Sequence, residues 1–398
     1  MGARLLRRVV SGAFVFAASG VAACSAIGDG PGASGFLPLD AAPPAIDSAG
    51  IDVSLGGGTD AGLFDGGCAT GTARAVHDPI YMLFVVDGSG SMNQDQKWAA
   101  FVPALDLLID DLLSKKDTSF AVGLTIFSDT NDTTLGKGPY PTNDVPVAYV
   151  DATQAAKLHA RLDNAHPRYE TPTLAVLQGQ YPALESFVPT APLVTGGKRV
   201  VAFVTDGVPY PDPNDTQKPL VVKLVGDEFA KAAPAGPITT VSVGVGYFLP
   251  YSPQTYDPTF MGNLALAGGV PNKPCYPEIT QDPSLFCHFQ VTPGGGAFQL
   301  ENEFRIAFDK IRSKVASCEF TLEKADGGAP VEPDKANVVF TDDYNEQSIV
   351  PEDPQDGWTY DDPVNPTKIV LHGKSCSALR ANVRGQVEVV LGCKTVVR

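Results

Sequence analysis

Four short runs of apolar or β-branched residues divide the first two thirds of the chain, and each ends at a polar or glycine-containing turn. The runs are residues 80–86, 120–127, 200–204 and 238–245. A run that stays apolar, rather than alternating with polar residues, is typical of a strand that is buried on both faces. The four runs therefore predict a mostly parallel central sheet.

Helical periodicity appears between these runs. Apolar residues recur every three or four positions in residues 98–112, 173–187, 218–232 and 304–315, which predicts helices. Pro103 is expected to kink or delay the first of them. Strands that alternate with helices predict a doubly wound, Rossmann-like α/β domain. Such folds bind ligands beyond the carboxyl ends of their strands, where the strand order reverses, so functional residues are expected just after Val86 and Val204.

The C-terminal residues follow a different pattern. Short β-like runs at residues 318–322, 337–340, 368–371 and 387–391 are separated by Pro, Asp and Gly turns. They predict a small β-rich module of about four to six strands, with a packed aromatic corner at residues 357–363. The expected division of the chain is a signal peptide at 1–23, a linker at 24–67, the α/β domain at 68–316 and this module at 317–398.

The N-terminus has the features of an export signal. Three arginines precede an apolar stretch that is too short to span a bilayer. The stretch ends in VAAC, which resembles the lipobox of bacterial lipoproteins, so Cys24 would carry the lipid and anchor the chain to the membrane. The alternative is an ordinary signal peptide with an incidental cysteine. Serine, not aspartate, follows Cys24, so the expected location is the outer membrane, facing the periplasm or the cell surface. Residues 25–67, without Lys or Arg, predict a flexible tether.

Composition and charge narrow the function classes. The chain has 398 residues, of which 43% are hydrophobic and 19% charged, and this excludes a wholly disordered chain and a polytopic membrane protein. The formal net charge is -16. A surface this acidic repels phosphate backbones, so nucleic-acid binding is not expected.

The cysteine pattern agrees with export. An even number of cysteines after Cys24 favours disulfides in an exported chain. Cys275 and Cys287 are close in sequence and are expected to close a local loop, while the other four are expected to tie the N-terminal edge to the C-terminal module. The alternative is a set of buried free thiols. The six candidates are Cys68, Cys275, Cys287, Cys318, Cys376 and Cys393.

Three oxygen-bearing side chains stand two residues apart after the first strand. They are Asp87, Ser89 and Ser91, with glycines between them. Residues two apart in extended backbone point the same way, and glycines let the backbone approach a bound ion. One carboxylate with two hydroxyls is a hard-oxygen set that suits Mg²⁺ or Mn²⁺ better than zinc.

At these residues the chain resembles the von Willebrand factor type A domain and its metal-ion-dependent adhesion site. The resemblance covers about residues 78–316. The five positions that match the family pattern, in family order, are Asp87, Ser89, Ser91, Thr171 and Asp206. Thr173 is an alternative to Thr171. The closing residues 392–394 also resemble the end of C-terminal regions in exported myxobacterial lipoproteins.

This resemblance implies that the serines and the threonine bind a divalent cation directly or through water. The aspartates mostly hold ordered waters, and an acidic side chain of a partner often completes the octahedron. Mg²⁺ is the expected ion, with Mn²⁺ and Ca²⁺ as alternatives. Asp129 and Asp132 are close enough in sequence to the second strand to rim the site, but solvated loop acids are the favoured interpretation.

The expected function is therefore that of a surface-tethered, non-enzymatic adhesion protein whose cation coordinates an acidic group of a protein partner. The alternative is an envelope assembly or scaffold factor, in which the metal is structural and the loops or the C-terminal module bind. The loops at 247–260 and 270–291 are either contact surface or self-packed covers. A metal-dependent hydrolase is disfavoured because no nucleophile or general base is recognisable beside the motif.

Overall fold

The computed structural model describes residues 71–77, 79–116, 120–193, 195–232, 236–246, 256–272, 275–278, 282–293, 296–315, 318–322, 332–342, 344–382, 386–391 and 393–397. The expected signal peptide, the lipidation site Cys24, the linker and Cys68 lie outside these residues. Among the residues described, no helix combines the length and the apolar character needed to cross a bilayer.

A six-stranded sheet is the centre of the α/β part, with the strand order β4-β3-β2-β5-β6-β7. All neighbouring strands are parallel except β3 and β4. The α/β class with a mostly parallel sheet is thus confirmed, and β4 and β7 are additions that the apolar runs did not predict. The strands are β2 (Ile80–Asp87), β3 (Phe120–Phe127), β4 (Val145–Tyr149), β5 (Lys198–Thr205), β6 (Ile238–Val245) and β7 (Phe289–Val291).

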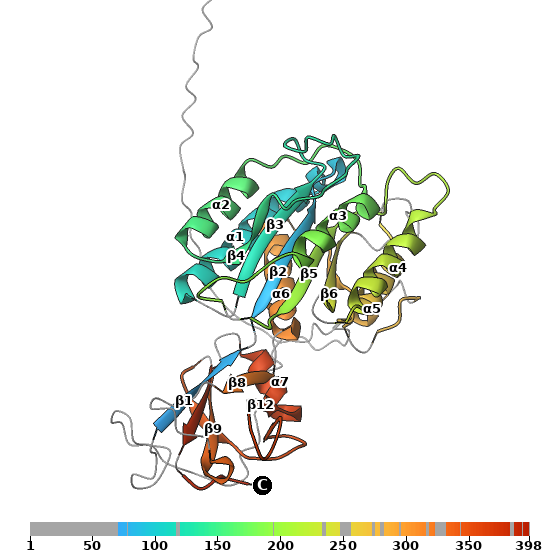
Figure 1. Cartoon of the computed structure of the whole chain (residues 1–398). Helices are drawn as coiled ribbons and strands as arrows, with labels where there is room; N and C mark the ends of the chain where they lie inside the picture. Colours follow the sequence, from blue (N-terminus) through green and yellow to red (C-terminus); the bar gives the residue numbers. More distant parts are fainter. Residues whose placement is uncertain are drawn as a thin grey trace, which may run out of the picture. The chain divides into compact units, whose positions relative to one another are not determined.

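Helices cover both faces of this sheet (Figure 1). One face packs against α1, α2 and α6, and the other packs against α3, α4 and α5. Their bounds are α1 (Lys97–Lys115), α2 (Ala152–Asp163), α3 (Thr173–Glu185), α4 (Gln217–Phe229), α5 (Pro258–Ala267) and α6 (Ala297–Val315). Short 3-10 turns lie at η1 (Gly90–Asn93), η2 (Pro283–Leu285) and η3 (Pro333–Lys335).

The central strand β2 shows why its sequence is apolar throughout. Every residue of β2 is buried. Phe84 belongs to the core on the α1 side and meets Phe308 of α6 with ring centroids 5.6 Å apart, whereas Tyr81 faces the other way and meets Phe187 at 5.0 Å.

Pro103 does not delay α1, which begins before it and continues through it. Burial of neighbouring apolar residues such as Phe101 offsets the hydrogen bond that proline cannot make.

The strand order reverses between β2 and β5. From β2 the chain runs outward through β3 to β4, and then returns to place β5 on the other side of β2. The two strands pair in parallel, with Val86 opposite Val204. Asp87 and Asp206 therefore leave adjacent strand ends at the same edge of the sheet.

The C-terminal residues form a second, antiparallel sheet of seven strands, in the order β10-β9-β13-β1-β8-β12-β11. Its strand β1 (Gly71–His77) precedes the α/β part in the sequence and pairs with β13 and with β8. The predicted division places β1 in the α/β domain at 68–316, whereas the structure pairs β1 with strands of the module at 317–398. The remaining elements are β8 (Glu319–Leu322), β9 (Ala336–Thr341), β10 (Gln347–Val350), β11 (Trp358–Tyr360), β12 (Lys368–Leu371), β13 (Gln386–Leu391) and the helix α7 (Gly373–Ala381).

An aromatic pair anchors the core of this second sheet. Trp358 is fully buried, and its ring meets the ring of Tyr360 edge to face with centroids 4.9 Å apart. The indole N–H of Trp358 donates to the carbonyl of Val350 at 3.0 Å. The predicted packed corner at residues 357–363 is therefore present, with its polar atom satisfied as buried tryptophan requires.

Disulfides join the cysteines largely as expected. Cys275 pairs with Cys287, and Cys318 pairs with Cys376. Cys393 is disulfide-bonded as well. The first pair closes a local loop, and the second joins the start of β8 to α7. The disulfide framework of the C-terminal module therefore agrees with the prediction for the residues that are described.

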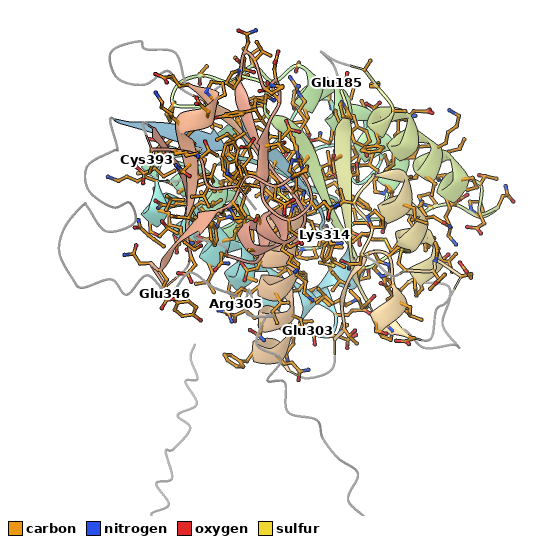
Figure 2. All side chains as sticks on the ribbon, turned by 90° about the horizontal axis from the view of Figure 1, so that it is seen from below. Glu185, Glu303, Arg305, Lys314, Glu346 and Cys393 are labelled. Carbon is orange, nitrogen blue, oxygen red and sulfur yellow. A yellow bond between two sulfur atoms is a disulfide. The ribbon has the colours of Figure 1, made fainter. Side chains whose placement is uncertain are left out.

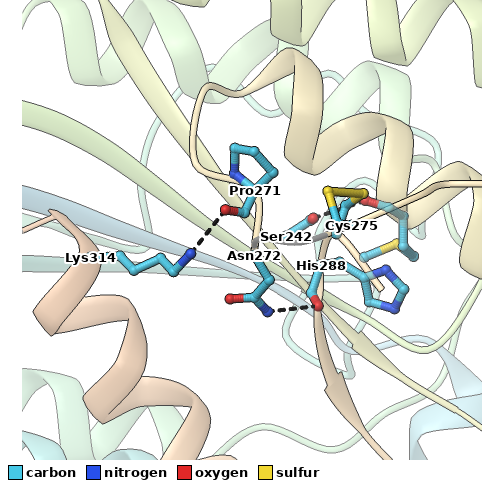
Figure 3. The surroundings of a disulfide bond; sticks show 8 residues. Ser242, Pro271, Asn272, Cys275, His288 and Lys314 are labelled. Carbon is cyan, nitrogen blue, oxygen red and sulfur yellow. Dashed lines mark hydrogen bonds between the residues drawn. A yellow bond between two sulfur atoms is a disulfide. The ribbon is translucent and has the colours of Figure 1, made fainter. Parts of the chain in front are cut away.

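The loop around Cys275 and Cys287 is held by several further bonds (Figure 3). The side chain of Asn272 donates to the carbonyl of His288 at 3.1 Å, and the ammonium of Lys314 donates to the carbonyl of Pro271 at 2.9 Å. Lys314 lies on α6, where Figure 2 also labels Glu303 and Arg305. This part of the 270–291 loop is therefore packed against the domain, which favours the self-packed interpretation there.

Candidate metal centre

Asp87 and Asp206 stand at the ends of adjacent strands and are both buried. Asp87 is the last residue of β2, and Asp206 directly follows β5. The hydroxyl of Thr205 donates to Oδ2 of Asp87 at 2.5 Å, and the backbone N–H of Ser89 donates to Oδ1 at 2.8 Å. The carboxylate of Asp87 therefore fixes the turn that carries the serines.

The two serines connect this turn to the second aspartate. Oγ of Ser89 lies 3.1 Å from Oγ of Ser91, and the hydroxyl of Ser91 donates to Oδ1 of Asp206 at 2.8 Å. Ser91 is only partly buried, whereas Ser89 and Asp206 are almost fully buried. Four of the five predicted residues, Asp87, Ser89, Ser91 and Asp206, thus form one connected cluster, and Ser91 gives it access to solvent.

Glycines allow the turn to approach its neighbours. The N–H of Gly88 donates to the carbonyl of Phe127 at 2.8 Å, and a Cβ at Gly88 would lie only 2.8 Å from that oxygen. A Cβ at Gly90 would lie 3.2 Å from the carbonyl oxygen of Arg168. A larger residue at Gly88 would push the serine-bearing turn away from β3.

Thr171 belongs to a third segment that is joined to both of the others. Arg168 donates its N–H to Gly88 at 2.8 Å, and Gly90 donates to Tyr169 at 3.0 Å. Thr171 exchanges backbone hydrogen bonds with Tyr210, in the loop that follows Asp206, at 3.0 and 2.8 Å. The backbone thus brings Thr171 to the site.

The choice between the two threonines stays a prediction. Thr171 and Thr173 are both buried. Within the described part of the chain, the buried hydroxyl of Thr173 has no hydrogen-bond partner. Thr171 remains the residue that matches the family pattern.

Lys97 is a member of the cluster that the sequence analysis missed. Its Nζ lies 2.5 Å from Oδ2 of Asp206, with only 9% of the Lys97 side chain and none of the Asp206 side chain exposed. Lys97 is the first residue of α1, where the positive end of the helix dipole disfavours a cation. The sequence could have indicated this role in one way, since the lysine stands at the start of the predicted helix that follows the serine turn.

The electrostatics of the site leave negative charge buried. The pKa of Asp87 is raised from 3.8 to about 7, first because burial penalises the carboxylate and second because the charge of Asp206 is close. Hydrogen bonds from Thr205 and Ser89 oppose this rise only in part. Two buried carboxylates and one ammonium leave an excess of one negative charge when all three groups are ionised.

This donor set fits a hard divalent cation. Hydroxyl and carboxylate oxygens are ligands that Mg²⁺ and Mn²⁺ accept. The buried charge of Asp87 is the kind of unfavourable term that a cation would offset. Among the residues that the structure describes, no group of three or more His, Cys, Asp or Glu side chains is placed to hold a metal, so any metal at this site depends on the hydroxyls.

The two further loop acids have structural roles, and the expectation that they are solvated is wrong for Asp129, whereas Asp132 is half-buried. Asp129 is fully buried and accepts two hydrogen bonds from Arg161, at 2.8 and 3.1 Å. Asp132 accepts from the backbone N–H groups of Ser128 and Thr134 at 2.8 and 2.7 Å, so it closes its own turn. Neither side chain is available to the cluster.

No family model matches the chain, and no curated protein matches it. Similar solved structures include the pilus adhesin SpaC from Lactobacillus rhamnosus GG, with 13% identity over 80% of this chain and 40% of that chain and a TM-score of 0.41. A von Willebrand factor type A protein from Catenulispora acidiphila has 14% identity over 82% of this chain and 62% of that chain, with a TM-score of 0.37. Manganese-loaded TRAP protein of Plasmodium vivax has 16% identity over 72% of this chain and 84% of that chain, with a TM-score of 0.38.

The chain spans less than two thirds of the length of SpaC and of the Catenulispora protein. Identities and TM-scores this low carry no argument about what the chain binds.

Proposed function

We propose that the chain is a surface-tethered, non-enzymatic binding protein that uses a divalent cation to coordinate a carboxylate of a protein partner. The cation, Mg²⁺ or Mn²⁺ with Ca²⁺ as the alternative, is held by Asp87, Ser89, Ser91, Thr171 and Asp206. One observation carries this proposal, namely the hydrogen-bonded row of oxygens from Ser89 through Ser91 to Asp206 at the point where the strand order reverses.

The chemistry follows from which oxygens are charged. The serine and threonine hydroxyls are neutral, so a cation bound to them keeps most of its charge for an acidic group supplied from outside. Asp87 is too deeply buried to meet a partner and acts by holding the backbone of Ser89. Ser91 is the partly exposed member of the cluster, and we place the approach of the partner's carboxylate on its side.

The rim of the site offers a surface for a protein partner. Tyr210, which is bonded to Thr171 through its backbone, has 58% of its surface exposed. Arg168 is exposed beside the serine turn, with its guanidinium 5.2 Å from the ring centroid of Tyr169. Tyrosine and arginine are enriched in protein interfaces and carry much of their binding energy.

The location that suits this function is the cell envelope. The disulfides agree with an oxidising compartment. A lipid on Cys24 and a flexible linker would let the domain reach a partner away from the outer membrane, on its periplasmic or its outer side. Mass spectrometry of the chain isolated from its source would detect or exclude the lipid.

The test is metal binding followed by partner capture. Mn²⁺ titration should show one site per chain, lost in Ser89→Ala and kept in Ser186→Ala, a matched change at an exposed serine whose hydroxyl donates to the carbonyl of Ala183 in its own helix. The immobilised chain should capture a partner from the source envelope in Mg²⁺ but not in chelator. If the partner is captured equally well in chelator and by the Asp87→Ala variant, the result would instead favour the assembly or scaffold alternative, in which the loops or the C-terminal module bind.

A further inference from the structure

Lys97 stands in a position that is costly for a lysine. Its side chain is almost fully buried, and it begins α1, where the exposed N–H groups of the first turn favour an anion. The preceding residue, Gln96, makes no side-chain cap that would relieve these groups. The ion pair with Asp206 is what offsets these costs.

Both oxygens of Asp206 are already engaged. Oδ2 accepts from the ammonium of Lys97 at 2.5 Å, and Oδ1 accepts from the hydroxyl of Ser91 at 2.8 Å. A cation that binds Asp206, directly or through a water, has to take one of these oxygens. The hydroxyl of Ser91 can rotate and offer a lone pair to the metal, but the ammonium has none to offer and repels the metal.

We propose that Lys97 is a built-in counter-cation that competes with the divalent ion for the charge of Asp206, so that the metal binds tightly only when the ammonium moves away. This rests on the proposed function, because it takes the cluster to be a metal site. Lys97 then sets the metal concentration at which the site fills, and so the concentration at which the acidic group of a partner can be held. It also keeps the two buried carboxylates from facing each other uncompensated when no metal is bound.

The first experiment measures Mn²⁺ affinity by electron paramagnetic resonance in the full chain and in Lys97→Met, which keeps the length of the side chain without its charge. We expect Lys97→Met to bind Mn²⁺ at least about tenfold more tightly, because a neighbouring unit charge no longer repels the ion. Lys97→Arg should not gain affinity. Lys218→Met is the matched control, since it removes a lysine that is ion-paired to Asp257 at 2.9 Å outside the site, and it should leave the affinity unchanged.

A second measurement follows the ammonium itself. If Mg²⁺ displaces Lys97 from Asp206, labelling of Lys97 by an amine-reactive reagent should rise with Mg²⁺ in the unmodified chain, as read by mass spectrometry of the digest. Labelling of Lys218 should not change. A constant labelling of Lys97 at Mg²⁺ concentrations that fill the site would overturn the displacement.

The outcomes separate the two proposals. Equal Mn²⁺ affinity of the unmodified chain and Lys97→Met would overturn the role of Lys97 and leave the metal site intact. Absence of Mn²⁺ binding in both would overturn both proposals. Circular dichroism checks that the variants are folded, and Lys97→Gln repeats the measurement without charge if the methionine variant does not fold.

Discussion

Replacing Asp87 with asparagine should make the metal-free protein more stable while removing its metal binding. The pKa of Asp87 rises from 3.8 to about 7 because the carboxylate is buried and lies near Asp206. Since the folded pKa lies above the unfolded value, the ionised carboxylate destabilises the fold. This penalty is absent below pH 3.8, grows as the pH rises, and is complete above about pH 7.

The magnitude follows from the same values. A pKa raised from 3.8 to about 7 corresponds to a penalty of about 4 kcal/mol in the free energy of unfolding. Asparagine keeps the oxygen that accepts from the N–H of Ser89, but it weakens the bond with Thr205, which costs about 1 kcal/mol. We therefore expect Asp87→Asn to gain about 2–3 kcal/mol in chelator at about pH 8.

Urea unfolding measures this gain, and Asp129→Asn is the matched control. Asp129 is equally buried, but it is ion-paired with the guanidinium of Arg161, which also binds Asp144. Removing its charge leaves a largely buried cation with less compensation and should cost about 3 kcal/mol. The reasoning is refuted if Asp87→Asn is less stable than the unmodified chain in chelator, or if its gain does not shrink as the pH falls toward 5.

Three further predictions concern stability elsewhere in the chain. His288 is almost fully buried and its pKa is lowered from 6.5 to about 4 by that burial, so its own contribution to stability is complete above pH 6.5 and falls by up to about 3 kcal/mol as the pH falls toward 4. Unfolding curves of Asp87→Asn, in which the opposing effect of Asp87 is absent, should show this loss, and adding His288→Gln should reduce it. Gly179→Ala should destabilise the fold by at least about 2 kcal/mol, because its Cβ would lie 2.0 Å from a backbone carbonyl oxygen. Gly226→Ala, whose Cβ would have its nearest neighbour at 3.8 Å, should instead stabilise α4 by about 0.5–1 kcal/mol. A melting temperature that is higher for Gly179→Ala than for Gly226→Ala would contradict this. Replacing both Cys318 and Cys376 with serine opens a loop of 58 residues and should cost about 4 kcal/mol in denaturant unfolding, and a loss below about 1 kcal/mol would show that the disulfide is not a stabilising link.

The central strands of the α/β sheet could be predicted from the sequence. The residues of β2 and β3 are all buried, so their apolar runs stand out. The edge strand β4 is short, contains Pro146 and alternates between buried and exposed positions near its start, and such a strand leaves little signal. The helix α2 was missed as well, although Asp151 accepts a hydrogen bond from the N–H of Gln154 and so marks its beginning.

The candidate site was predictable for a geometric reason. Asp87 and Asp206 follow apolar strands, and parallel strands that are neighbours end at the same edge of a sheet. Lys97 was not predictable in the same way, because its contact with Asp206 depends on the residue at which α1 begins and on the course of the turn before it. Local sequence gives such helix boundaries only approximately.

Strand β1 could not be assigned to its sheet from local sequence. Its partners β8 and β13 lie beyond the entire α/β part, and no residue near 71–77 specifies them. Pairing across so long a separation is a property of the folded molecule rather than of a pattern within one segment.

The pairing of β1 sets the order in which the chain can fold. His77 lies opposite Phe320, yet the ribosome releases β1 before the α/β part and β8 after it. Until β8 and β13 have been made, β1 has an open hydrogen-bonding edge, which is a site for mispairing with another chain. Early folding of the α/β part would shorten the flexible loop that must close before β1 can pair, and so reduce the entropic cost of this last step. A nascent chain that stops before β13 would therefore be released with a finished first sheet and an incomplete second one.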